Sequence, residues 1–224
     1  NNLSKKSLLK EIDDTLTRLQ TDHVDIYQMH WPDPNVPLEE TAEALEEMKK
    51  AGKIRYVGLS NFAQADVDKM MEYTDVHCQQ SLYNMLERNP VSYHSIPLDY
   101  LTEKEVLPNV KKHGQAFLPY SPLFQGLLAG KFNSGVNFSE HDIRNANPKL
   151  VGPDFEKYFN AAKQLKDLAD KYNKPMNEIA LNWLRQKEEV TSIIGGASSV
   201  KQLENNIHCT TWDIDDEMMK EIEI

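Results

Sequence analysis

Residues 24–62 read VDIYQMHWPDPNVPLEETAEALEEMKKAGKIRYVGLSNF, and this stretch decides the fold. Residues 24–31 are predicted to form a strand that ends at Pro32, and residues 54–62 are predicted to form a second strand. Between them, residues 38–51 show helical periodicity up to Gly52, a residue type that commonly ends helices. A strand, a helix and a strand in this order predict parallel strands joined by a right-handed crossover.

The same alternation continues along the rest of the chain. Further strands are predicted at residues 76–83, 116–121 and 191–194, with an irregular stretch at 88–100 and a long loop from 121 to about 153. Alternation without a break in composition predicts one α/β domain over residues 1–224. The other predicted helices cover residues 4–20, 63–73, 102–113, 155–172, 175–184, 200–207 and 216–222.

Polar residues gather at the carboxyl ends of the predicted strands. Strands of a parallel sheet are mostly buried, so polar residues at their ends are informative. A closed barrel and an open doubly wound sheet both place a ligand site at that edge, so the position alone does not choose between them. The absence of a GxGxxG motif after the first strand disfavours the open dinucleotide-binding sheet. The residues at these ends are His30, Ser60, Asn61, Gln80, Tyr120, Ser121, Gly195 and Gly196.

Each of these residues also has an ordinary structural interpretation. His30 and Gln80 are compatible with hydrogen-bonded core residues, and Tyr120 is compatible with simple packing. Ser60 and Asn61 are suited to capping the helix that follows them. The coincidence of all these residues at one end of one sheet favours a ligand site.

Composition and charge narrow the class of protein. The 224 residues carry 25 Lys+Arg against 35 Asp+Glu, and the net charge of −10 disfavours nucleic acid or an anionic membrane surface as a partner. No apolar run approaches the ~18 residues of a transmembrane helix, and the polar first residues argue against a signal peptide. Cys78 and Cys209 are too few for a disulfide framework, so we expect a cytoplasmic protein. The histidines show no metal-ligand spacing, so no metal is expected.

Four motifs together resemble one known family. RYVGLSNF at 55–62 resembles the second signature of the aldo-keto reductases, and LQTDHVDIYQMHWPD at 19–33 resembles their fourth strand with its active-site histidine. YSPLFQGLLAGK at 120–131 and IGGASSVKQLENN at 194–206 resemble the loops after their seventh and eighth strands. The chain is most similar to the bacterial and potassium-channel-β-like branches of the aldo-keto reductase family, because Gly196-Ala197 stands where another branch has Lys-Ser.

The resemblance implies a (β/α)8 TIM barrel that binds NADP(H) without a Rossmann domain. The five predicted strands would be strands 4 to 8, so the sequence is expected to be the C-terminal two-thirds of a reductase, without the N-terminal strands 1–3. The implied reaction transfers a hydride between a nicotinamide cofactor and an aldehyde or ketone. NADPH is the expected cofactor, and NAD(H) is not excluded. The physiological substrate and the oligomeric state stay open.

The resemblance also implies roles for individual residues. His30 is expected to hydrogen-bond the carbonyl of a small-molecule substrate, and Tyr120 to stack on the nicotinamide ring. Ser60, Asn61 and Gln80 are expected at the nicotinamide carboxamide. The family's catalytic Tyr, with its supporting Asp and Lys, has no counterpart in this sequence. The residues expected at the pyrophosphate are Ser121, Leu123, Gly126 and Lys131, and those at the adenosine end are Gly196, Ser198, Gln202, Asn205 and Asn206.

Two other classes of function remain open at this point. One is a nicotinamide-binding regulatory or channel-associated subunit on the same barrel, which a basic surface would favour and the net charge of −10 disfavours. The other is a catalytically inactive fragment that serves as a scaffold. An absence of cofactor binding would favour the scaffold.

Overall fold

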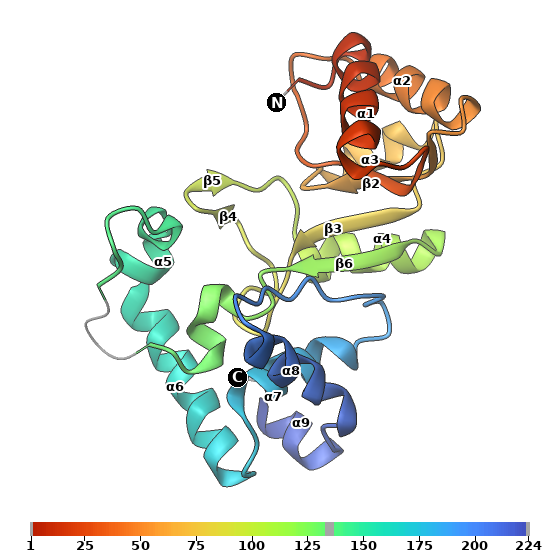
Figure 1. The fold of residues 1–224 in the computed structure, drawn as a ribbon. Coiled ribbons are helices and arrows are strands. Elements are labelled where there is room, and N and C mark those ends of the chain that lie inside the picture. Colours follow the sequence, from red (N-terminus) through yellow and green to blue (C-terminus); the bar gives the residue numbers. More distant parts are fainter. Residues whose placement is uncertain (1, 133–136, 223–224) are drawn as a thin grey trace. The chain divides into compact units, whose positions relative to one another are not determined.

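The computed structural model describes residues 2–132 and 137–222. The chain divides into two compact units, of which the first comprises Asn1–Ser81 with Leu98–Phe117. The second comprises Leu82–Pro97 with Leu118–Ile224. Figure 1 labels the helices and strands of both units.

Parallel strands form the sheet, as the alternation of strands and helices predicts. The register places Tyr27 opposite Val57 and Ser60 opposite Gln80, and both strand pairs are parallel. The predicted parallel pairing of the first three strands is therefore confirmed. The sheet has the order β1-β2-β3-β6, with β1 Val24–Met29, β2 Ile54–Ser60, β3 Cys78–Leu82 and β6 Ala116–Tyr120.

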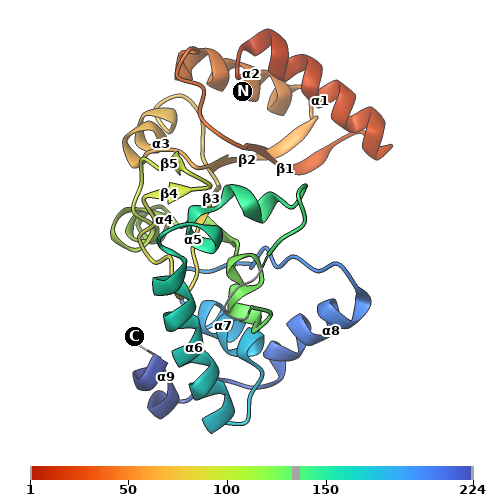
Figure 2. The ribbon, with the colours of Figure 1, turned by 90° about the vertical axis from the view of Figure 1, so that its left-hand side faces the viewer.

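Helices cover one face of this sheet in the first unit, where α1 and α2 lie side by side (Figures 1 and 2). Ile12, Leu45 and Met29 are buried together, and Tyr27 packs against the same core. Ile26, on the opposite face of β1, is 46% exposed, as expected from the alternation of side chains along a strand. The helices are α1 Lys5–Leu19, α2 Leu38–Lys50, α3 Gln64–Met70 and α4 Leu107–His113, the last preceded by a π-helical turn at Thr102–Val106.

On the other face of the sheet, Gly58 leaves room for the side chains of Gln28 and Cys78 to approach each other. A Cβ atom at Gly58 would lie 2.5 Å from Sγ of Cys78 and 2.5 Å from Cγ of Gln28. With no side chain in the way, Nε2 of Gln28 donates a hydrogen bond to Sγ of Cys78 at 3.2 Å. The glycine thus permits a contact between side chains of the two neighbouring strands.

The second unit is built mainly from helices. α6 contacts both α7 and α9, and Leu165, Ile179, Leu184 and Met218 are buried in this unit (Figures 1 and 2). The helices are α5 Pro148–Val151, α6 Phe155–Lys171, α7 Met176–Arg185, α8 Val200–His208 and α9 Asp216–Ile222, with 3-10 turns at Phe124–Ala129, Ile143–Ala146 and Cys209–Thr211. The predicted long loop after residue 121 contains two of these turns and α5, and its residues 133–136 lie outside the described residues.

Two predictions for this unit are wrong in detail. Residues 191–194 do not form a strand, and Ile194 pairs with Tyr120 through an isolated parallel bridge. The stretch at 88–100 is not wholly irregular, since β4 Ser92–Tyr93 and β5 Ile96–Pro97 form an antiparallel hairpin. Its turn residues His94 and Ser95 have φ of 48° and 65°, as a type I′ turn requires, but lack the Asn-Gly pair that usually marks one.

Candidate functional site

The first unit brings together the four predicted residues at its strand ends. The backbone N–H of Asn61 donates to the carbonyl of Gln80 at 3.2 Å, which joins the end of β2 to β3. Nδ2 of Asn61 donates to the carbonyl of His30 at 3.2 Å and to Oγ of Ser60 at 3.0 Å. Ser60 and Asn61 are buried, whereas His30 is exposed. Asn61 therefore links the ends of three strands.

Tyr100 holds the other side of the Asn61 carboxamide. Its hydroxyl donates to Oδ1 of Asn61 at 2.9 Å, and Tyr100 is only 2% exposed. Ser60 and Asn61 do not cap the helix that follows them, because the N-cap residue of α3 is Ala63 and no side chain forms a hydrogen bond at that cap. Sequence reasoning missed Tyr100, which lies in a stretch without periodicity or motif.

A cavity of about 660 Å³ in the second unit collects most of the other predicted residues. Drug-sized ligands usually occupy cavities of roughly 300–1,000 Å³, so the volume suits a small molecule or part of a cofactor. Its lining also includes Gln125, Ile143, Arg144 and Ile194. The predicted residues on its wall are Ser121, Leu123, Gly126, Lys131, Gly196, Ser198 and Gln202.

One wall of this cavity is a tight turn after β6. Ser121, Gln125 and Gly126 have φ of 54°, 53° and 101°. The value at Gly126 is one that L side chains rarely adopt, so glycine is needed there. The carbonyl of Ser121 accepts hydrogen bonds from the N–H of Phe124 and from Nδ2 of Asn84, both at 3.0 Å. These bonds fix the turn against the rest of the unit.

Another part of the wall is the amino-terminal end of α8 with the turn before it. Ser199 caps the helix by accepting the N–H of Gln202 at 3.3 Å, and Oε1 of Gln202 accepts the N–H of Ser198 at 2.9 Å. Nδ2 of Asn206 donates to the carbonyl of Gly196 at 3.3 Å and so supports the preceding turn. Helix amino termini favour anionic groups such as phosphate.

Arg144 lines the same cavity, and sequence reasoning missed it. Its guanidinium is bound by both carboxylate oxygens of Asp142, with Nε to Oδ1 at 2.9 Å and Nη2 to Oδ2 at 2.5 Å. These hydrogen bonds lower the pKa of Asp142 to about 2. Lys131 and Arg144 are the basic side chains among the described lining residues. A lone arginine in a loop carries no signal by which the sequence could have identified it.

Three predicted residues do not line this cavity. The ring of Tyr120 instead meets that of Tyr93 edge-on, with centroids 5.3 Å apart. Asn205 is exposed on α8, and Asn206 supports the turn at Gly196.

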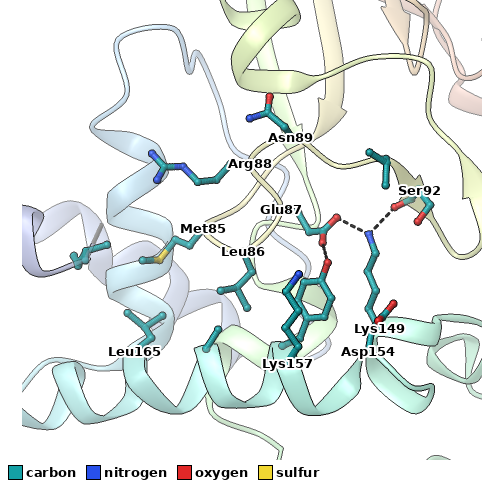
Figure 3. A pocket seen from close by; sticks show the side chains of 14 residues that line it. Met85, Leu86, Glu87, Arg88, Asn89, Ser92, Lys149, Asp154, Lys157 and Leu165 are labelled. Atoms are coloured by element: carbon teal, nitrogen blue, oxygen red, sulfur yellow. Dashed lines mark hydrogen bonds and ion pairs between the residues drawn. The ribbon is translucent and has the colours of Figure 1, made fainter. Parts of the chain in front are cut away.

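A second cavity, of about 610 Å³, lies in the same unit beside α6 and contains none of the predicted residues (Figure 3). Glu87, Lys149 and Tyr158 form a hydrogen-bonded group in its wall. Burial and the neighbouring Glu87 carboxylate raise the pKa of Tyr158 above its ordinary value, so its hydroxyl stays protonated and acts as a donor.

The part of the chain that the structure describes holds neither a metal-ligand cluster nor a membrane-spanning helix. Within residues 2–132 and 137–222, no group of three or more His, Cys, Asp or Glu side chains is arranged to hold a metal ion. Among the described helices, none combines the length and the apolar character needed to cross a membrane.

Comparison with known proteins gives one consistent family. The sequence profile of the aldo/keto reductase family matches residues 1–224. The chain is 36% identical over 220 residues to aldo-keto reductase YhdN of Bacillus subtilis, which covers 98% of this chain and 63% of that protein. It is 28% identical over 218 residues to the NADH-specific methylglyoxal reductase of Escherichia coli (strain K12), which covers 96% of this chain and 63% of that protein.

A solved structure agrees with the sequence comparisons. Glycerol dehydrogenase AKR11B4 from Gluconobacter oxydans is similar with a TM-score of 0.86 and 31% identity, over 100% of this chain and 64% of that chain. The chain thus has an α/β fold with a parallel sheet, like the barrels of this family, and spans less than two-thirds of the length of these relatives.

Proposed function

The chain belongs to the aldo/keto reductase family, and from this membership we propose that the full protein is an oxidoreductase acting on aldehydes or ketones with a nicotinamide cofactor. The observation that carries the proposal is the cavity of about 660 Å³ between the turn after β6 and the start of α8. Its wall holds seven residues for which the family resemblance implies cofactor contacts. The reductases and dehydrogenases among its relatives support the same activity.

The residues of the second unit fit the phosphate and adenosine parts of such a cofactor. Lys131 and the capped amino terminus of α8 supply positive charge and N–H donors, and Gly196 leaves open space where a side chain would stand. We assign Ser121, Leu123, Gly126 and Lys131 to the pyrophosphate. We assign Gly196, Ser198, Gln202, Asn205 and Asn206 to the adenosine end.

The residues of the first unit fit the nicotinamide end. We assign Ser60, Asn61 and Gln80 to the carboxamide, because an amide ligand needs both donors and acceptors and these three side chains supply both. Tyr120 of the second unit is assigned to the nicotinamide ring. A bound nicotinamide cofactor supplies the hydride, and His30 is assigned to hydrogen-bond the substrate carbonyl and polarise it.

We assign no proton donor among residues 1–224. Reduction of a carbonyl builds negative charge on its oxygen, and a general acid contributes roughly 10²–10⁴-fold to such a step. The family's catalytic Tyr, Asp and Lys have no counterpart in this sequence. We further assign the parallel segments to strands 4 to 8 of one barrel domain, which the 63% share of YhdN's length supports.

NADPH is the cofactor that we propose first, with NADH as the alternative. Arg144 and Lys131 lie on the cavity wall and suit a further phosphate, but Asp142 neutralises Arg144. Gln202 and Gly196 carry no charge, and one relative is named as specific for NADH. We also propose a cytoplasmic setting, which is supported by the two cysteines, both free.

The experiment that tests the function is a titration of the full-length protein with NADPH and with NADH, followed by protein fluorescence. Turnover of a reactive aromatic aldehyde is then followed by cofactor absorbance. Binding with turnover is expected. Binding without turnover would favour a regulatory subunit, and absence of binding would favour a scaffold.

A further inference from the structure

Lys149 is a buried cation in the second unit. It lies on α5 and is only 8% exposed. Its Nζ donates to Oε2 of Glu87 at 2.6 Å and to the carbonyl of Ser92 at 2.8 Å (Figure 3). The other carboxylate oxygen of Glu87, a residue that is 3% exposed, accepts the hydroxyl of Tyr158 on α6. One buried ion pair therefore joins α5, α6 and the segment at 87–92.

The ion pair, and not the hydrogen bonds of the helix, is expected to hold α5 in place. α5 comprises only the four residues Pro148–Val151, and so short a helix is not stable by its own hydrogen bonds. A buried ammonium group without a counter-charge would be strongly unfavourable, so Lys149 stays inside only while Glu87 is present. The position of α5 thus depends on Glu87.

A chain of hydrogen bonds leads from Lys149 to the wall of the cofactor cavity. The backbone N–H of Lys149 donates to Oδ1 of Asn147 at 3.1 Å. Nδ2 of Asn147, which is 3% exposed, donates to Oε1 of Gln125 at 2.9 Å. Gln125 lies on the wall of the cavity of about 660 Å³.

A second route from Lys149 reaches the same side chain. Ser92, which accepts from Nζ of Lys149, lies on β4, and His94 lies in the turn of the same hairpin. Nε2 of His94 is 2.7 Å from Nε2 of Gln125. The carboxamide of Gln125 is therefore held at its oxygen by Asn147 and at its nitrogen by His94, and both partners are connected to Lys149.

We propose that Lys149 and Glu87 are positioning residues that fix Gln125 in the cavity wall and so slow the release of the cofactor. The inference rests on the proposed function, because it takes the cavity to be the cofactor site. Neither residue lines that cavity, so the pair acts through Asn147 and His94. It gives the ion pair a role beyond stability.

The test uses variants of the full-length protein that remove the pair without leaving a buried charge. In Glu87→Gln combined with Lys149→Met, the glutamine still accepts the hydroxyl of Tyr158 and no ion is left unpaired. Gln125→Ala removes the end of the network directly. The matched control is Lys166→Met, which removes the exposed ion pair with Asp170 on α6.

The measurement is the rate of NADPH release in stopped-flow fluorescence. We expect release about tenfold faster in the double variant and in Gln125→Ala, and unchanged in Lys166→Met. Combining all three substitutions is expected to add nothing to Gln125→Ala, because both act through one contact. The KM for the carbonyl substrate is expected to stay unchanged.

Wild-type release in the double variant would overturn the inference, and so would fully additive effects with Gln125→Ala. If the double variant does not fold, Asn147→Ala combined with His94→Ala cuts both connections to Gln125 and leaves the ion pair intact, with the same expected and overturning results. A wild-type protein that binds neither NADPH nor NADH would overturn the proposed function together with this inference. A wild-type protein that binds while the variants release it normally would overturn this inference alone.

Discussion

Nδ1 of His208, in the last turn of α8, lies 3.0 Å from both carboxylate oxygens of Glu178 on α7. Glu178 is buried, with 5% of its side chain exposed, and it also accepts Nε1–H of Trp212 at 2.8 Å. None of the nine residues of α8, all of which the structure describes, is buried. The polar contact to Glu178 therefore ties α7 to α8, the helix whose first turn lines the cavity of about 660 Å³.

Glu178→Ala is expected to destabilise the protein by about 2 kcal/mol, because Trp212 and His208 lose their shared acceptor. The free energy of unfolding in urea measures the change. Glu204→Ala, which removes an exposed carboxylate from α8, is the control and is expected to lie within about 0.5 kcal/mol of wild type. Equal stability of the two variants would contradict the role of Glu178.

Gly58→Ala is expected to destabilise the protein by about 1–3 kcal/mol, since the new Cβ would lie 2.5 Å from atoms of both Cys78 and Gln28. Chemical denaturation again gives the value. Gly196→Ala serves as the control, because no atom lies within 4 Å of the position that its new methyl group would take. A Gly58→Ala protein as stable as this control would show that the neighbouring strands adapt without strain.

Asn61→Ala and Gln80→Ala are each expected to weaken cofactor binding about fivefold, the loss of one hydrogen bond worth on the order of 1 kcal/mol. Fluorescence titration of the full-length protein measures this. Asn35→Ala removes an exposed amide that bonds to the neighbouring Asp33, and its affinity is expected to equal that of wild type. Unchanged affinity in both test variants would remove these residues from the site.

Stability is expected to fall in acid through His94. Burial, and then the charge of Lys149, lower the pKa of His94 from its ordinary 6.5. A folded-state pKa below the unfolded one means that the folded state favours the neutral ring. Its contribution is complete above pH 6.5 and is lost as the pH falls through the lowered pKa. Comparing the pH dependence of unfolding for wild type and His94→Gln tests this, and parallel profiles would contradict it.

The chain of residues 1–224 alone is expected to reduce carbonyls far more slowly than an ordinary enzyme. In the proposed reaction His30 is assigned to polarise the carbonyl, but no residue of this sequence is assigned to deliver the proton. Tyr27 packs against the core on the helix-facing side of the sheet, so it is not assigned as the proton donor. NADPH oxidation with an aromatic aldehyde measures the rate. Turnover at about 1 s⁻¹ or faster would reveal an acid within these residues.

The sequence by itself determined the parallel direction of the first three strands and the side of the sheet that meets the helices. Tyr27 and Met29 pack toward the helices because burial of one face imposes a period of two on a strand. Asn61 and Gln80 meet because parallel strands end at the same edge. These features follow from local patterns, which short stretches of sequence contain.

Only the tertiary structure decided which distant residues complete the cavity and hold it. Lys149 and Glu87 are separated by 62 positions, and no local pattern relates them. Arg144 becomes part of the cavity wall through the path of its loop, and residues 191–194 form only an isolated bridge at Ile194 instead of a strand. Burial, pairing and strand extent depend on contacts between segments far apart in the chain, and those contacts exist only once the segments have packed.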